Sequence, residues 1–437
     1  MPNLDALFSD FIAVRQCTEF LCQNLLLEDY HLQPVADVSP AKWHLAHTSW
    51  FFEQFILQDV QNYTCFHPQY NYLFNSYYES VGKRWDRAAR GDLSRPAVET
   101  IYQYRAHVQE AIAAALPRFS ERQLQLLQLG MHHEQQHQEL LLTDLKYSLG
   151  LNPLFPALQT KAAKPSLLRH RADGEHKISE NWFEIPAGVY WVGFSEAEPF
   201  KAEPSLSVDF SFDNERGAHR VFINPCEIAT QTVTQREYLA FVEAGGYTRP
   251  EFWLSDGWDW CQREQIQAPL HWHFQDNAWW NYTLSGLQRL DLDAPVTHLS
   301  FFEADAYARF CGARLPTEFE WEVAVQLLQP QNPFTEAQHS PFLESGYWQP
   351  VPYGGFWGNV WEWTASAYLP YPGFEVAEGA VGEYNGKFMN GQYVLRGGSC
   401  ATPHAHIRAT YRNFFMPEKR WQFTGLRLAR SLKEKSC

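Results

Sequence analysis

The chain has 437 residues, of which 45% are hydrophobic and 19% are charged, and its formal net charge is −15. This length exceeds one ordinary hydrophobic core and the composition excludes a disordered chain, so we expect two domains. The acidic balance argues against a nucleic-acid partner, and no apolar run approaches the roughly 20 residues of a membrane span. With no C-x-x-C pair among its eight cysteines and no basic signal-peptide start, we expect a reduced, cytoplasmic protein.

Residues 1–155 carry the three- and four-residue apolar spacing of amphipathic helices. Ser39-Pro40 is typical of a helix start, and Ser120 with Gln123 forms a capping-box pattern. Four helices are expected, over Leu4–Leu27, Trp43–Val60, Pro96–Leu116 (opened by Ser94) and Ser120–Gly150. They predict a four-helix bundle with one long excursion, residues 60–93, between the second and third helices.

The amino-acid composition and the apolar spacing change in the second half of the chain. Residues 156–180 are rich in Pro, Lys and Ala and predict a linker. Residues 181–437 begin with a strand-like stretch, Phe183–Gly193, and continue with frequent Gly, Trp and Asn. One or two short helices are expected, near Thr234–Ala244 and Phe302–Cys311. We predict an α+β protein whose second domain is irregular, mostly coil and strand.

The sharpest chemical signal is a histidine cluster in the fourth helix. His133 and His137 are four residues apart, so they share one helix face and can bind one metal. His44 and His47 lie on the second helix, and in a bundle one of them can face that pair. Three imidazoles leave open positions on a metal, which suits catalysis, but their spacing does not separate iron from zinc.

The same string reads His133-Glu134-x-x-His137, the zinc metalloprotease motif in which Glu134 would be the general base. That interpretation needs a third ligand downstream. No Glu lies between Leu140 and Gly174, and the one His there is His170, in the expected linker. No carboxylate is obviously placed to complete the two-His-one-carboxylate triad of many iron oxygenases. A three-histidine site is therefore favoured.

Longer motifs make the chain similar to a known family. His47, followed by His133-x-x-x-His137-x-Glu139, resembles the DinB-like helical domain of sulfoxide synthases. The second half resembles the formylglycine-generating enzymes, whose fold is C-type-lectin-like, through Pro295–Ser300, Ala313–Glu322, Gly358–Thr364, Leu395–Ser399 and Thr424–Arg427. In this order and combination, the motifs resemble the EgtB family of ergothioneine-biosynthesis sulfoxide synthases, which is related to OvoA.

The resemblance implies a non-haem Fe(II) held by His47, His133 and His137, with O2 as co-substrate. It also implies a reaction in which a thiol sulfur is joined to C2 of the imidazole of hercynine, N-alpha-trimethylhistidine, and is oxidised to a sulfoxide. His44 would then pack or hydrogen-bond beside the ligands. The substrates implied are small molecules, and nothing in the sequence indicates the oligomeric state.

The same resemblance implies functions for two pairs of residues between the second and third helices. A tyrosine of the Asn-Ser-Tyr-Tyr stretch, Tyr77 or Tyr78, would give a proton as a general acid. Arg87 and Arg90 would bind the carboxylate of the sulfur donor, for which the planar guanidinium is well suited.

The resemblance also implies which residues bind hercynine. Gln136 would hydrogen-bond the hercynine imidazole, and Asn413 with Phe414 would meet its carboxylate and trimethylammonium group. One branch of the family has an acidic residue at the position of Phe415 and an Arg at that of Lys419, and these hold the glutamyl part of gamma-glutamylcysteine. Because Phe415 cannot pair with an ammonium group, we predict free cysteine as the donor.

Three alternatives remain at this point. OvoA shares the Phe-Phe pattern, so histidine is an alternative acceptor, and gamma-glutamylcysteine is an alternative donor. A metal-dependent thiol transferase is an alternative from another class, because DinB-like domains also carry out that chemistry. The cysteine pair of the formylglycine-generating enzymes is replaced by Thr402 and Ile407, so we expect their fold without their copper–thiol chemistry.

Overall fold

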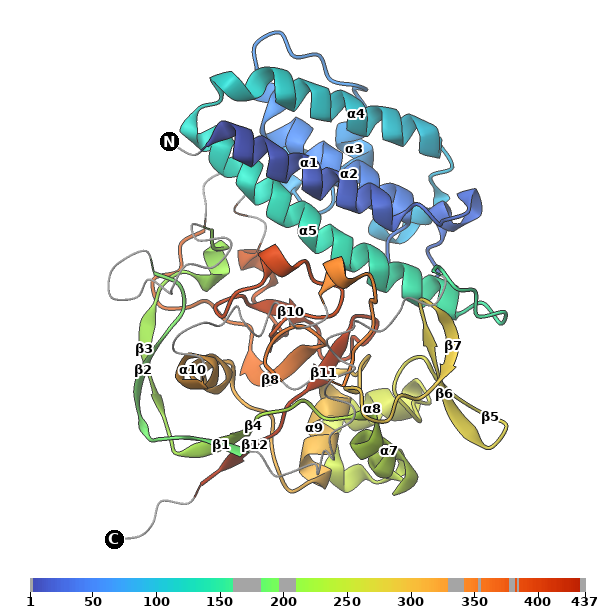
Figure 1. The fold of residues 1–437 in the computed structure, drawn as a ribbon, viewed down its shortest axis with the longest axis vertical. Helices are drawn as coiled ribbons and strands as arrows, with labels where there is room; N and C mark the ends of the chain where they lie inside the picture. Colours follow the sequence, from blue (N-terminus) through green and yellow to red (C-terminus); the bar gives the residue numbers. More distant parts are fainter. Residues whose placement is uncertain are drawn as a thin grey trace. The chain divides into compact units, whose positions relative to one another are not determined.

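Figure 1 shows the computed structural model of the chain, which describes residues 3–159, 182–195, 210–328, 342–352, 355–376, 382 and 385–432. The chain divides into two compact units, the first built mainly from Met1–Gln159 and the second from most of the remaining residues. The division falls inside the segment expected to be a linker. Because residues 160–181 lie outside the described part, the linker stays a prediction.

The first unit contains the expected four-helix bundle. Its long helices are α1 (Leu4–Leu21), α2 (Ala41–Phe55), α4 (Val98–Ala115) and α5 (Glu121–Gly150). Helix α2 packs against both α4 and α5, and α1 packs against α5 (Figure 1). The excursion between α2 and α4 contains the short helix α3 (Tyr70–Phe74) and the 3-10 turns η3 (Glu79–Val81) and η4 (Arg87–Asp92).

The helix ends follow from local chemistry and correct some of the expected bounds. The capping box of α5 is confirmed, since the Gln123 backbone N–H donates to Ser120 Oγ at 3.3 Å and the Ser120 N–H donates to Gln123 Oε1 at 3.0 Å. Helix α2 starts after Pro40 and not after a Ser39 cap. Helices α1 and α2 end earlier than expected, and each is followed by a 3-10 turn, η1 (Leu27–His31) and η2 (Leu57–Asp59).

The bundle core contains a carboxylate between two guanidinium groups. Glu134 accepts hydrogen bonds from Arg15 Nη1 at 2.9 Å, Arg105 Nη2 at 2.9 Å and Thr18 Oγ1 at 2.7 Å, and it is fully buried. Burial opposes its ionisation, but the two arginines outweigh this, so the pKa of Glu134 lies below its ordinary value. Glu134 thus ties α5 to α1 and α4. Occupied in this way, it cannot serve as the base of a metalloprotease.

The second unit is built from small sheets. The strands are β1 (Trp182–Ile185), β2 (Gly188–Val192), β3 (His219–Ile223), β4 (Cys226–Ala229), β5 (Trp272–Gln275), β6 (Ala278–Thr283), β7 (Gly286–Arg289), β8 (Trp361–Ala367), β9 (Tyr393–Arg396), β10 (Asn413–Phe415), β11 (Thr424–Leu426) and β12 (Ala429–Ser431). They pair in the orders β1-β4-β12, β2-β3, β5-β6-β7 and β10-β9-β8-β11. The single strand expected over Phe183–Gly193 is therefore two strands in different sheets, separated by Pro186 and Ala187.

The two helices expected in this unit are confirmed as α7 (Gln235–Glu243) and α9 (Phe301–Phe310). Two more were not expected, α8 (Ser255–Arg263) and α10 (Glu318–Leu328). Together with the helical first unit, these elements confirm an α+β protein with two domains.

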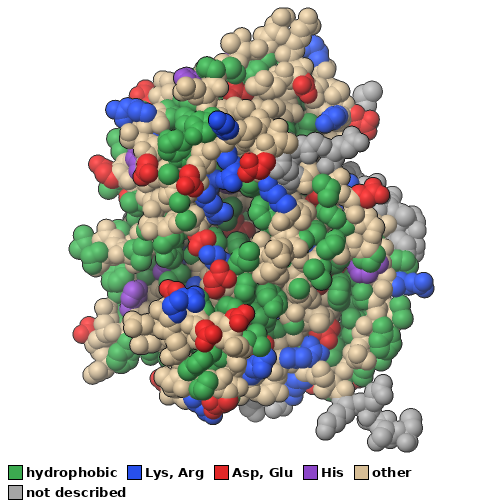
Figure 2. Space-filling view, turned by 180° about the vertical axis from the view of Figure 1, so that it is seen from behind, with side chains coloured by type: hydrophobic (Ala, Val, Ile, Leu, Met, Phe, Trp, Pro, Cys, Tyr) green, Lys and Arg blue, Asp and Glu red, His purple; other side chains and the backbone are tan. Residues whose placement is uncertain are grey.

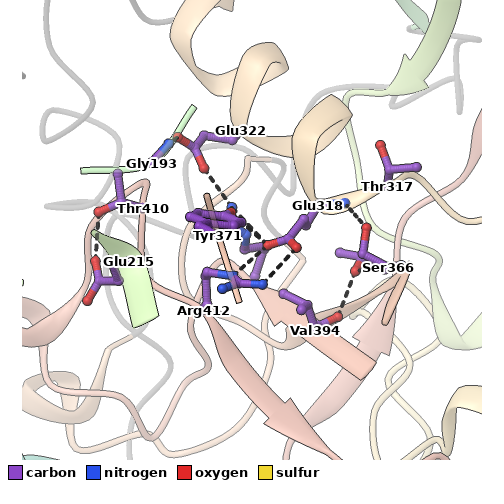
Figure 3. Close-up of polar contacts among 12 residues, drawn as sticks. Gly193, Glu215, Thr317, Glu318, Glu322, Ser366, Tyr371, Val394, Thr410 and Arg412 are labelled. Carbon is purple, nitrogen blue, oxygen red and sulfur yellow. Dashed lines mark hydrogen bonds and ion pairs between the residues drawn. The ribbon is translucent and has the colours of Figure 1, made fainter. Parts of the chain in front are cut away.

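Buried ion pairs hold the second unit together. Glu318 on α10 accepts from Arg412 Nε at 2.8 Å and from the Tyr371 hydroxyl at 2.9 Å (Figure 3). Glu322, one turn along the helix, accepts from Arg396 Nη2 at 2.6 Å. All of these side chains are less than 5% exposed. Because Arg412 directly precedes β10, its bond to Glu318 fixes the strand that carries Asn413, Phe414 and Phe415.

The surface mixes charge types. On the face shown in Figure 2, acidic and basic side chains are interspersed with apolar ones. Among the helices in the described ranges, none combines the length and the apolar character needed to cross a bilayer.

Several thiols are buried and protonated. Burial raises the pKa of Cys22 to about 12, that of Cys226 to about 12 and that of Cys261 to about 11. No disulfide occurs among the cysteines that the structure describes.

Replacing Glu134 with Gln should lower the free energy of unfolding by about 3–5 kcal/mol, because two buried arginines would lose their anion. Urea unfolding of the metal-free protein measures this. Since the pKa of Glu134 is lower in the folded chain than its ordinary value of 4.5, its contribution is present at neutral pH and is lost as the pH falls. The control Glu121→Gln, on the exposed first turn of α5, should cost less than about 1 kcal/mol. Equal losses for the two variants would contradict the role of Glu134.

Candidate metal centre

Three histidine side chains converge inside the bundle. His47 comes from α2, and His133 and His137 come from successive turns of α5. One ring nitrogen from each lies within 4.8 Å of the others, and the Nε2 atoms of His47 and His133 are 3.2 Å apart. None of the three residues is more than 9% exposed. The structure thus brings together the three histidines that the sequence indicated as metal ligands.

These imidazoles are neutral at ordinary pH. Burial lowers the pKa of His133 to about 3. Burial and the neighbouring histidines also lower the pKa values of His47 and His137 well below the ordinary range. A neutral imidazole keeps a lone pair for a metal, so three converging nitrogen donors fit a divalent transition metal such as iron or zinc.

One hydrogen bond and two aromatic contacts hold the ring of His47. Its Nδ1 lies 2.6 Å from the carbonyl oxygen of Phe74, so Nδ1 carries the hydrogen and donates it. The Nε2 lone pair is then directed toward His133. Trp43 stacks on one side of the His47 ring at 4.4 Å between centroids, and the Trp50 ring lies 5.3 Å away in a similar orientation. These contacts fix both the tautomer and the plane of the ring.

His44 lies beside the cluster and is not part of it. Its Nδ1 is 2.8 Å from His137 Nδ1, and its Nε2 is 3.1 Å from Asp144 Oδ2. Asp144 was not among the site residues expected from the sequence. The signal was available, because Asp144 lies seven residues after His137 on α5, which is two helical turns along the same face.

Arg90 is a buried cation beside the histidine cluster. It is 4% exposed, and its guanidinium lies 3.5 Å from the centroid of Trp43, the ring that stacks on His47. Its Nη atoms donate to Ser39 Oγ and Ser76 Oγ, each at 2.9 Å, while its Nε is buried without a hydrogen-bond acceptor. Among the described residues, no carboxylate forms an ion pair with Arg90. A cation in this state is suited to an anionic ligand.

Arg87 has a different environment. Its guanidinium is exposed and donates to the carbonyl oxygens of Ala36, at 3.1 Å, and Asp37, at 2.6 Å. Both arginines therefore contact the segment before α2, but only Arg90 is buried.

The two candidate tyrosines lie side by side. Their rings stack with centroids 4.6 Å apart. Tyr78 is fully buried, with ring centroids 5.1 Å from Phe55 and 5.6 Å from Trp50, whereas Tyr77 is half-buried. Trp50 also contacts His47, so one indole ring separates the tyrosine pair from the histidine cluster. Gln136, on α5 beside His137, is half-buried.

The other candidate substrate residues lie in β10 of the second unit. Phe414 stacks on Tyr368 with centroids 4.0 Å apart and planes 10° from parallel. Phe415 makes an edge contact with Trp421 at 5.5 Å. Successive side chains of a strand point to opposite faces, so the two phenylalanines serve different surfaces. Asn413 precedes them and is half-buried.

Changing any one of His47, His133 and His137 to Ala should abolish stoichiometric binding of Co(II) or Fe(II), because two nitrogen donors remain. Calorimetric titration of the metal-free protein checks this. The control His67→Ala, an exposed histidine of the same unit, should leave the stoichiometry unchanged. Full metal occupancy in one of the three variants would exclude that residue as a ligand.

Comparison with known proteins gives two family matches. Residues 179–432 match the sulfatase-modifying factor enzyme 1-like domain, and residues 10–141 match the DinB superfamily. The chain is 31% identical over 429 residues to the hercynine oxygenase of Mycolicibacterium smegmatis, covering 92% of this chain and 93% of the relative.

Two further relatives agree with this match. The hercynine oxygenase of Mycobacterium tuberculosis is 31% identical over 416 residues, covering 90% of this chain and 91% of its own. Ergothioneine biosynthesis protein 1 of Schizosaccharomyces pombe is 26% identical over 235 residues, covering 51% of this chain and 28% of its own. With this identity over nearly the whole of both bacterial relatives, the chain belongs to the hercynine oxygenase family.

Proposed function

We propose that this protein is a non-haem iron sulfoxide synthase. It joins the sulfur of cysteine to C2 of the hercynine imidazole with O2 and yields hercynylcysteine sulfoxide. The observation that carries the proposal is the convergence of three buried, neutral histidines in a chain that belongs to the hercynine oxygenases.

His47, His133 and His137 would hold Fe(II). The bound metal would supply open coordination positions, stabilise a coordinated thiolate and provide the redox chemistry with O2. The protein's own contribution is rigidity: the Phe74 carbonyl and the flanking indoles keep the His47 ring in one orientation. Burial excludes water and keeps the imidazoles neutral.

Arg90 would bind the carboxylate of cysteine. Its Nη atoms bond to two serine hydroxyls and its Nε has no hydrogen-bond acceptor, so binding an anion would compensate the desolvation of the guanidinium. Trp43 lies between Arg90 and His47, so an anion at Arg90 would sit near the metal ligands. Arg87 would support this subsite by fixing the segment before α2 through the carbonyls of Ala36 and Asp37.

Tyr77 or Tyr78 would act as general acid. Both belong to the loop after α3, and the side-chain amide of Asn75 holds that loop through the backbone of Tyr78, at 2.9 and 3.1 Å. A tyrosine hydroxyl of this loop would supply the proton that the oxygen chemistry needs. The enclosed aromatic surroundings of Tyr78 would keep that proton away from bulk water.

On the second unit, Asn413 and Phe414 would bind hercynine. The trimethylammonium group has no N–H to donate, so an aromatic face is its natural partner. The stack of Phe414 on Tyr368 offers a rigid aromatic surface for it. Phe415 packs on Trp421. Neither side chain is an anion that could pair with the ammonium of a glutamyl group. Their apolar character therefore favours free cysteine as the donor.

Protein loaded with Fe(II) and given O2, cysteine and hercynine should form hercynylcysteine sulfoxide, detected by mass spectrometry. Parallel reactions replace hercynine with histidine, or cysteine with gamma-glutamylcysteine, and each should turn over more slowly. Equal turnover of histidine would favour an OvoA-like synthase. A thiol adduct formed without O2 would favour a thiol transferase, and absence of any sulfoxide would contradict the proposal.

Arg90→Met should raise the KM for cysteine by about tenfold or more, the loss expected for a hydrogen bond to a charged group, with a smaller change in kcat. Arg84→Met is the matched control, since Arg84 is exposed and already paired with Glu79 at 2.8 Å. Steady-state kinetics with each substrate varied in turn measure this effect. A rise in the KM for hercynine alone would remove Arg90 from the donor site.

A further inference from the structure

A chain of hydrogen bonds between buried polar groups leads from His137 away from the other two histidines of the cluster. His137 Nδ1 lies 2.8 Å from His44 Nδ1, and His44 Nε2 lies 3.1 Å from Asp144 Oδ2. The same carboxylate oxygen accepts from the backbone N–H of Ser39 at 2.7 Å. His137 is 9% exposed, His44 1%, Asp144 4% and Ser39 6%, so bulk water does not compete for these bonds.

The acceptors along this line assign its hydrogens. Asp144 Oδ2 already accepts from the Ser39 N–H, so His44 Nε2 is the donor in its bond to the same oxygen. For His137 to bind a metal through Nε2, its hydrogen lies at Nδ1 and is donated to His44 Nδ1. His137 is left with its own lone pair at Nε2, which is the state that a metal requires.

We propose that His44 and Asp144 are positioning residues that fix the tautomer of His137 and make it a stronger electron donor to the metal. A carboxylate behind a ligating imidazole raises the basicity of that ligand, and here the carboxylate acts through a second imidazole. His47 differs, because its Nδ1–H is donated to the neutral carbonyl of Phe74. The proposal rests on the metal site described above, but not on the identity of the substrates.

Helix packing alone does not require this arrangement. Burying His44 and Asp144 costs free energy unless their hydrogen bonds compensate for the lost water. Two substitutions separate packing from positioning. Asp144→Asn keeps the shape of the side chain and removes its charge. His44→Gln keeps an acceptor and a donor, whereas His44→Leu removes both at similar volume.

The first measurement uses the full-length, metal-free protein labelled with 15N-histidine. The nitrogen shifts should show His137 with its hydrogen on Nδ1 in the wild type, and a mixture of tautomers in His44→Leu. A wild-type His137 with its hydrogen on Nε2 would overturn the proposal. This experiment needs neither substrate nor turnover, so its result stands apart from any failure of the sulfoxide synthase assay.

The second measurement is the affinity for Co(II), with the Fe(III)/Fe(II) midpoint potential as a companion. Asp144→Asn and His44→Leu should weaken Co(II) binding by about 10–100-fold and raise the potential, whereas His44→Gln should stay close to the wild type. Asp59→Asn, an exposed carboxylate of the same unit, is the control.

Wild-type affinity and potential in both Asp144→Asn and His44→Leu would overturn the proposal. Equal losses in His44→Gln and His44→Leu would do the same, because packing and not hydrogen bonding would then matter. Circular dichroism confirms the fold of each variant. Should Asp144→Asn fail to fold, the two His44 variants decide the outcome.

Discussion

The hydrogen-bonded ion pair of Glu134 with Arg15 and Arg105 sets the rotation of α5 about its own axis. Successive residues of an α-helix point about 100° apart, so a carboxylate held toward α1 and α4 turns the preceding residue, His133, toward α2. His137 follows one turn later on the same face. The histidine cluster therefore depends on hydrogen bonds that α5 makes from a neighbouring face.

Buried glutamate–arginine pairs also hold the second unit in one arrangement. Its sheets have two to four short strands, which provide few ladder hydrogen bonds for a segment of this length. Buried glutamate–arginine pairs such as Glu318 with Arg412 connect α10 to the loops that lead into β10. A fully desolvated pair is destabilising when broken and tolerates few alternative geometries. Irregular backbone is thereby held in one arrangement.

Local patterns predicted much of the first unit, because helix caps and four-residue spacing are short-range features. The cap at Ser120 and the shared helix face of His133 and His137 could be predicted without tertiary information. Helix α10 could not, since Glu318–Glu322 alternates acidic and apolar residues as a strand would, and burial of its glutamates depends on arginines far away in sequence. The different environments of Arg87 and Arg90 likewise depend on tertiary contacts, which their three-residue spacing does not reveal.

The raised pKa values of the buried thiols have a consequence for a protein proposed to handle a thiol and O2 together. Disulfide exchange and oxidation proceed through the thiolate. A thiol whose pKa is about 12, such as Cys22 or Cys226, is ionised at neutral pH only to the order of one molecule in 10⁵. The thiols of Cys22 and Cys226 are therefore weak nucleophiles toward disulfides and poor targets for oxidants.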